Sequence, residues 1–223
     1  MEMEGIVFIA TGIAIFTVIN VMIIVIVLKF RRKFVGNVDD HMKLLAETLE
    51  LPLAGGDSVF PKIGFLSWIR RPLRIEGERR GCDVSIYHYS TGGKNSTTYA
   101  TVRITINNPK DLKLGFSQES VLGKVGKAFG MQDIQTGDPR FDDKFIVKCS
   151  DPDFIKRALL PEIKERFYEV WETHKSQGSI TLKDEVFAYN EVGMINKETT
   201  RNRIVVVAEL MCDLGGIVKF YNQ

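Results

Sequence analysis

The sequence predicts an α+β protein: an N-terminal single transmembrane helix followed by a globular domain with an antiparallel β-meander and packed helices. Three observations predict this fold class. A long charge-free stretch lies near the N-terminus, a middle segment alternates apolar with polar residues, and later segments repeat apolar residues every three or four positions. Because runs of strands precede runs of helices, without a regular strand–helix alternation, an α+β domain is expected.

The charge-free stretch covers residues 6–28. At about 1.5 Å per residue, a helix of this length reaches roughly 34 Å, enough to cross a hydrocarbon core of about 30 Å. Residues 29–33 then carry four positive charges, and such clusters stay on the cytoplasmic side of a membrane. We therefore expect a retained single-pass anchor with a basic stop over residues 1–34, its N-terminus outside and the C-terminal domain in the cytoplasm.

Small residues within this stretch offer a contact surface for a second helix. Ala10, Gly12 and Ala14 would let another backbone approach closely, and Asn20 could hydrogen-bond across the contact. A protein partner or a homo-oligomer through the transmembrane helix is therefore one interpretation. A lone helix facing lipid is favoured, because the small-residue spacing is weaker than a true GxxxG.

Residues 35–72 predict a juxtamembrane helix and a connector. Apolar residues recur at helical spacing over 37–49, with Asn37 available as the N-cap. Prolines and glycines then interrupt residues 51–72, so an irregular connector is expected. It contains a candidate membrane-interface patch that would contact the lipid bilayer, although burial of its aromatic residues in the core is favoured. The patch consists of Phe65, Trp68, Arg70 and Arg71.

Residues 73–223 are expected to form one α+β globular domain, with a sub-lobe junction near 130–142. Its first part alternates with a period of two over three segments, which predicts three strands of a meander followed by a shorter fourth strand near 112–116. Turn residues separate the strands at Arg80-Gly81 and over 90–95.

Helical spacing returns in the second part of the domain. A helix over 121–129 is expected to end at Gly130, and a short buried strand follows at 145–149. Asp151-Pro152 has the N-cap and proline of a helix start, and Pro161 begins a second helix. The remaining elements are a hairpin over 179–189 that turns at Lys183-Asp184 and a helix over 198–214 that ends before Gly215-Gly216.

Charge and cysteine content argue against two kinds of site. Residues 1–34 hold four of the 30 basic and two of the 28 acidic residues, so the rest carries 26 of each. No basic stripe dominates, which argues against nucleic acid as a partner. Cys82, Cys149 and Cys212 have no CxxC spacing and lie in apolar contexts, so we expect small core side chains in a reducing compartment.

No motif in the sequence fixes a chemistry. The spacings of a phosphate loop, a dinucleotide-binding loop, a zinc-protease helix and a serine-nucleophile turn are absent. Of His41, His88 and His174, only His88 stands beside a glycine-rich loop at the end of a predicted strand. The acidic residues between 133 and 153 lack calcium-loop spacing, so solvated loop carboxylates are favoured. We assign no catalytic residue, cofactor or metal.

Five arginines surround the start of the predicted sheet. Their functional interpretation is a patch that binds lipid headgroups, and the simpler one is a solvated strand face balanced by Glu76 and Glu78. The arginines are Arg70, Arg71, Arg74, Arg79 and Arg80.

One block resembles a known group of proteins. Residues 133–148 read DIQTGDPRFDDKFIVK, followed by Asp151 and Leu159-Leu160. This block is similar to a stretch in uncharacterised prokaryotic membrane-anchored proteins of unknown function. The resemblance implies a membrane-tethered α+β domain and no catalytic or binding residues. From the residues themselves, Phe141 is expected to anchor a connector in the core ahead of a buried strand.

Two functions are consistent with these observations. The first is a binding or scaffolding module, favoured because an anchor is expected and no catalytic constellation is found. The alternative is a membrane-tethered enzyme, a hydrolase whose site is assembled from scattered polar residues. A deep pocket with two or more convergent ionisable groups would favour the enzyme, whereas a shallow apolar groove would favour the module.

Overall fold

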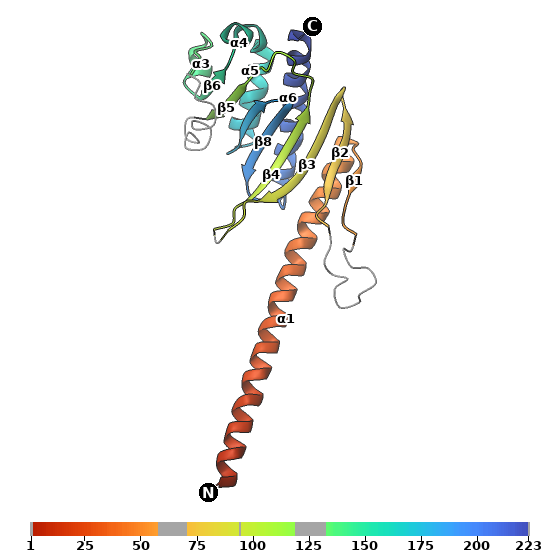
Figure 1. The fold of residues 1–223 in the computed structure, drawn as a ribbon, viewed down its shortest axis with the longest axis vertical. Helices are drawn as coiled ribbons and strands as arrows, with labels where there is room; N and C mark the ends of the chain where they lie inside the picture. Colours follow the sequence, from red (N-terminus) through yellow and green to blue (C-terminus); the bar gives the residue numbers. More distant parts are fainter. Residues whose placement is uncertain (1, 58–70, 94, 119–132, 223) are drawn as a thin grey trace. The chain divides into compact units, whose positions relative to one another are not determined.

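The computed structural model describes residues 2–57, 71–93, 95–118 and 133–222. They fall into two compact units, Met1–Asp40 and His41–Gln223. The first unit is the N-terminal part of helix α1 (Glu2–Leu49). The second unit holds the end of that helix, the β-sheet and the other described helices (Figure 1).

An antiparallel sheet forms the centre of the second unit, so the expected α+β architecture is confirmed there. In the described part of the chain its eight strands follow the order β1-β2-β3-β4-β8-β7-β5-β6. The strands are Leu53–Ala54 (β1), Arg74–Arg79 (β2), Cys82–Ser90 (β3), Thr98–Thr105 (β4), Leu114–Gln118 (β5), Phe145–Cys149 (β6), Ser179–Lys183 (β7) and Val186–Val192 (β8).

The expected three-stranded meander is confirmed as β2, β3 and β4. Ile86 on β3 lies opposite Ile75 on β2 and Val102 on β4, and all three side chains are fully buried. The fourth expected strand forms as β5, but it pairs with β6 and β7. It is separated from β4 because the β7–β8 hairpin pairs with β4 instead.

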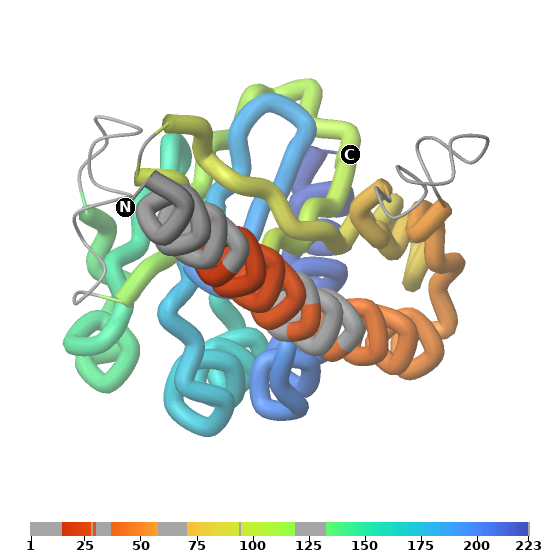
Figure 2. Tube along the Cα trace, turned by 90° about the horizontal axis from the view of Figure 1, so that it is seen from below, coloured from red at the N-terminus to blue at the C-terminus, as the bar shows by residue number. Residues whose placement is uncertain are grey.

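The remaining helices pack against this sheet. They are α3 (Pro139–Asp142), α4 (Pro152–Ala158), α5 (Pro161–Tyr168), its π-helical continuation η3 (Glu169–Thr173), and α6 (Glu198–Tyr221). Figure 2 shows α6, in blue, on one side of the yellow-green strands β3 and β4. The apolar stripe of α6 is fully buried there through Ile204, Val207 and Met211.

Two expected helix starts and one core contact are confirmed. Asp151 accepts hydrogen bonds from the backbone N–H groups of Asp153 and Phe154, and Pro152 opens α4. Pro161 opens α5 in the same way. Phe141 is fully buried, with its ring centre 5.5 Å from that of Phe167, so it does anchor the preceding connector.

The prediction of a transmembrane helix over residues 6–28 is wrong. Among the described residues, no helix has a stretch that is both long and apolar enough to cross a bilayer. The apolar side chains that the structure describes there, from Ile15 to Val27, extend over about 20 Å at 1.5 Å per residue, whereas a crossing needs about 30 Å. Asn20 donates its side-chain amide to the carbonyl of Phe16 in the same helix, at 2.7 Å.

Two helix boundaries also differ from expectation. Helix α1 passes through Asn37 without a break, so Asn37 is not an N-cap, although Met42 and Leu45 are buried as the helical spacing predicts. Helix α6 continues through Gly215 and Gly216 to Tyr221. It does so because Gly215 packs closely on the sheet, where an added Cβ would lie 3.3 Å from Cys82 Sγ and from Ile106 Cγ2.

Some expectations fall outside the described residues. The helix expected over 121–129 does, and so do Phe65, Trp68 and Arg70 of the membrane-interface patch. Arg71 is described and exposed. Its guanidinium Nε lies 3.6 Å from the carboxylate of Asp57, on the other side of the undescribed segment.

Candidate ligand-binding groove

A groove of about 1040 Å³ lies between helices α4 and α5 and the last turns of α6. Its volume is at the upper end of the range for ligand sites in proteins, roughly 300–1,000 Å³. Arg80 from the β2–β3 turn and Lys110 from the loop before β5 complete its wall. The groove therefore joins four parts of the chain that are distant in sequence.

Large apolar side chains line the groove and remain in contact with solvent. Leu160 is 51% exposed and Phe220 is 78% exposed, and both lie beside Phe154, Ile163 and Ile217 in the lining. Exposed apolar side chains that cluster in this way mark sites of interaction in soluble proteins. The groove is thus suited to cover an apolar ligand.

Local sequence explains why these side chains are exposed. Leu160 lies between the end of α4 and Pro161, in an extended conformation, so it points away from the stripe that either helix buries. Ile217 and Phe220 lie on the part of α6 that continues beyond the two glycines. The break between α4 and α5 and the extension of α6 therefore create the groove together.

At one end of the groove, the charged side chains form ion pairs. Asp213 Oδ1 lies 2.7 Å from Arg80 Nη2, and Asp213 Oδ2 lies 3.0 Å from Arg166 Nε. Arg80 also forms an ion pair with Glu209 at 3.0 Å, and this hydrogen bond is the main reason that the pKa of Arg80 is raised. The carboxylate of Asp213 is therefore held between two arginines.

At the other end, two cationic groups flank the ring of Tyr221. Lys110 Nζ donates to the backbone carbonyl of Tyr221 at 2.6 Å and lies 4.4 Å from the ring centre. The guanidinium of Arg157 lies 5.6 Å from the same centre. Within the described part of the chain, neither cation is in a salt bridge. This end of the groove therefore holds two cations outside any salt bridge, with the carboxylate of Asp151 near Arg157.

Tyr221 is fixed by its hydroxyl group. The hydroxyl donates a hydrogen bond to the carboxylate of Asp151, the N-cap of α4. That hydrogen bond lowers the pKa of Asp151 and raises the pKa of Tyr221. The tyrosine therefore stays neutral, and its ring is held in place near the two cations.

The three histidines do not meet in the structure. His88 is partly buried in β3, where its Nε2 accepts a hydrogen bond from the backbone N–H of Ile195 at 3.0 Å, and burial lowers its pKa to about 4. His41 Nδ1 lies 3.4 Å from Arg201 Nη1. His174 follows η3 as its C-cap residue. None of them lines the groove.

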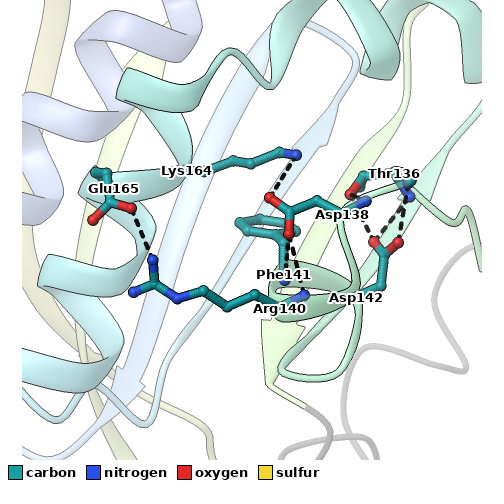
Figure 3. Close-up of polar contacts among 8 residues, drawn as sticks. Thr136, Asp138, Arg140, Phe141, Asp142, Lys164 and Glu165 are labelled. Atoms are coloured by element: carbon teal, nitrogen blue, oxygen red, sulfur yellow. Dashed lines mark hydrogen bonds and ion pairs between the residues drawn. The ribbon is translucent and has the colours of Figure 1, made fainter.

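The acidic region over 133–153 serves local structure. Asp138 accepts hydrogen bonds from the first N–H groups of α3 and pairs with Lys164 at 3.0 Å, while Asp142 accepts hydrogen bonds from Thr136 and Gly137 (Figure 3). Asp138 is thus the N-cap of α3, and Asp142 holds the preceding loop, while both remain partly exposed to solvent. No group of three or more His, Cys, Asp or Glu side chains among the described residues is arranged to hold a metal ion.

Among the arginines near the sheet that the structure describes, Arg74, Arg79 and Arg80 do not form one patch. Arg79 and Arg80 turn toward Glu209 on α6, with nitrogen–oxygen distances of 2.6 and 3.0 Å. The guanidinium of Arg74 instead lies 4.7 Å from the ring centre of Tyr87. Of these described arginines, Arg80 is the one that lines the groove. Lys110, Arg157 and Tyr221 were missed, because their proximity depends on the tertiary fold.

Comparison with known proteins gives only weak structural likeness. No protein-family model and no curated protein matches the chain. Among solved structures, the crystal structure of the mycobacterial trehalose monomycolate transport factor A, TtfA, matches with 10% sequence identity and a TM-score of 0.49. The match covers 81% of this chain and 95% of that chain. Identity and score at this level do not extend that protein's activity to this chain.

Proposed function

We propose that the second unit is a binding module whose groove takes an anionic amphiphile, a molecule with one apolar chain and one negatively charged head. The observation that carries this proposal is that exposed apolar residues and two cations outside any salt bridge line the same groove. Phe220 and Leu160 supply the apolar surface, and Lys110 and Arg157 supply the charge.

The apolar part of the ligand would lie along Leu160, Ile217 and Phe220. Covering their exposed carbon atoms removes apolar area from water, which is favourable by about 25 cal/mol per Å². The side chains come from helices whose opposite faces are buried in the core, so the site needs little reorganisation before a ligand binds.

The anionic head would lie at the Tyr221 end. Hydrogen bonds in which one partner is charged are worth about 1.5–3 kcal/mol, more than neutral ones. Lys110 offers an ammonium and Arg157 offers the fork of its guanidinium, which suits a carboxylate or a phosphate. The opposite end offers an anion less, because Arg80 and Arg166 are already in ion pairs with Asp213 and Glu209 there.

The groove supports binding better than hydrolysis. A hydrolase needs a nucleophile and a base that are free to react. In this groove Asp213 is held by two arginines, and the pKa of Cys212 is raised by its hydrogen bond with Cys82 and by burial, so its thiol stays protonated. We therefore prefer the binding module to the enzyme.

The test is calorimetric titration of the full chain with three ligands. Dodecyl phosphate carries both chain and anionic head, dodecyltrimethylammonium carries the same chain with a cationic head, and inorganic phosphate carries the head alone. All three are used below their micelle concentrations. We expect dodecyl phosphate to bind most tightly, because only it satisfies both parts of the groove.

Charge reversal then locates the site. Arg157→Glu and Lys110→Glu should each weaken dodecyl phosphate binding about tenfold or more, equivalent to about 1.4 kcal/mol. Lys156→Glu is the matched control, because Lys156 neighbours Arg157 but pairs with exposed Asp153 outside the groove lining. Exposed apolar side chains of α1 offer the dodecyl chain a second surface, so the charge-reversal variants are needed to show that binding occurs in the groove. Equal binding by wild type and Arg157→Glu would refute the proposal.

A further inference from the structure

We propose that Cys82 and Cys212 form a modification site, a thiol pair that a peroxide converts into an intramolecular disulfide. The proposal goes beyond ligand binding and does not depend on it. Cys82 opens strand β3 and Cys212 lies in α6, so the bond would join the sheet to the helix that forms one wall of the groove.

Each sulfur contacts the segment that carries the other. Cys82 Sγ lies 3.8 Å from the backbone carbonyl oxygen of Cys212, and Cys212 Sγ lies 3.7 Å from that of Arg79. Arg79 is the register partner of Cys82 across the β2–β3 hairpin. Both sulfurs therefore occupy the same space between this hairpin and α6.

Close packing of the helix on the sheet produces this arrangement. Gly215, one turn after Cys212, has no side chain, and a Cβ built there would lie 3.3 Å from Cys82 Sγ. The turn of the hairpin is tight, with φ values of 52° at Arg80 and 75° at Gly81. The backbone on both sides of the thiol pair is thus fixed by regular structure.

The two thiols differ in acidity, which favours reaction. The contact with Cys212 lowers the pKa of Cys82 to about 7, while the same contact raises the pKa of Cys212. Cys82 is therefore partly a thiolate near neutral pH, and the thiolate is the nucleophile. Cys212 lines the groove, which gives a small oxidant a route to the pair.

The reaction balances with hydrogen peroxide as the oxidant. The Cys82 thiolate attacks one peroxide oxygen, so that an S–O bond forms, the O–O bond breaks and hydroxide leaves. The Cys212 sulfur then attacks the sulfenic sulfur, the S–S bond forms, and the S–O oxygen leaves with a proton as water. Two electrons pass from the sulfurs to the peroxide.

Cys149 is a matched internal control. It is also buried, but its sulfur contacts only the backbone of Asp151 among the described hydrogen-bond partners, and burial raises its pKa to about 12. It should therefore stay reduced under conditions that oxidise the pair.

The experiment treats the folded full chain with hydrogen peroxide, alkylates the remaining thiols after denaturation, and maps peptides by mass spectrometry. We expect a dithiothreitol-reversible peptide linking Cys82 to Cys212, with Cys149 alkylated. The link should persist in Cys149→Ser and disappear in Cys82→Ser and Cys212→Ser. Its rate of formation should rise with pH through an inflection near 7, the value for Cys82.

Other products would overturn the proposal. They are links that involve Cys149, disulfide-linked dimers, and oxidation of Cys82 without a link. Alkylation of all three thiols, which would mean that peroxide oxidised none of them, would also overturn it. Circular dichroism of each serine variant verifies that it is folded, so loss of the link cannot arise from unfolding. A Cys82–Cys212 link that forms only after denaturation would overturn the proposal as well.

Discussion

At the scale of single residues, the protein uses burial and hydrogen bonds to fix charge states. His88 is neutral in the folded state because burial lowers its pKa to about 4, and in that state its Nε2 accepts the N–H of Ile195. In an unfolded chain the imidazole would titrate near about 6.5. The difference links the protonation of His88 to folding.

This difference predicts a loss of stability in mild acid. Between about pH 6.5 and 4 the unfolded chain binds a proton at His88 while the folded chain does not, so the stabilisation is complete above this window and is lost as pH falls through it. We expect about 2–3 kcal/mol to be lost between pH 7 and 4.5 from this group.

The measurement is urea unfolding of wild type and His88→Gln at both pH values. Glutamine retains a hydrogen-bond acceptor without titrating, and the carboxylates titrate alike in both proteins. Wild type should therefore lose about 2–3 kcal/mol more unfolding free energy than the variant. The same loss in both proteins would contradict the neutral, buried state of His88.

Residue-scale features with a local cause could be predicted from the sequence. The cap at Asp151, the helix start at Pro152 and the burial of Phe141 and of the cysteines all depend on neighbouring residues or on apolar character, and the structure has them. The cap at Asp138 and the loop contacts of Asp142 were not predicted. The short helix α3 that they serve has too few residues to show a periodic pattern.

At the scale of elements, the end of α6 determines the shape of the groove. The sequence predicts a stop before Gly215-Gly216, because glycine commonly ends helices. The helix continues because Gly215 is buried against Cys82 and Ile106, so the tertiary contact outweighs the low helix propensity of glycine. Gly216 is exposed, and nothing in the described structure lies within 4 Å of the position that a Cβ would take there.

The two adjacent glycines should therefore respond oppositely to the same substitution. Gly215→Leu overpacks the contact with the sheet and should cost about 1–3 kcal/mol of unfolding free energy. Gly216→Leu places a better helix former at an exposed site and should be neutral or stabilising by up to about 0.8 kcal/mol. Thermal or urea unfolding of both variants measures the difference. Equal effects would show that Gly215 does not lie at a close contact.

At the scale of the whole molecule, long-range pairing decides what local patterns cannot. Each strand of the meander has a period-two pattern, but nothing in that pattern indicates that the β7–β8 hairpin would pair with β4 and separate it from β5. The wrong prediction of a transmembrane helix near the N-terminus also came from a local pattern, the apolar run over residues 6–28. The groove could not be predicted from local patterns either, because Arg80, Lys110 and Tyr221 come together only in the folded chain.

The central claim is that the groove between α4, α5 and the end of α6 binds an anionic amphiphile. Photo-crosslinking tests it most directly, with a long-chain carboxylate that carries a diazirine at the end of its chain, followed by peptide mapping of the full chain. The claim predicts labels within 152–168 and 217–221 that excess dodecyl phosphate suppresses and Arg157→Glu reduces. Labels confined to residues 15–27 or 74–105, with both groove segments unlabelled, would contradict it.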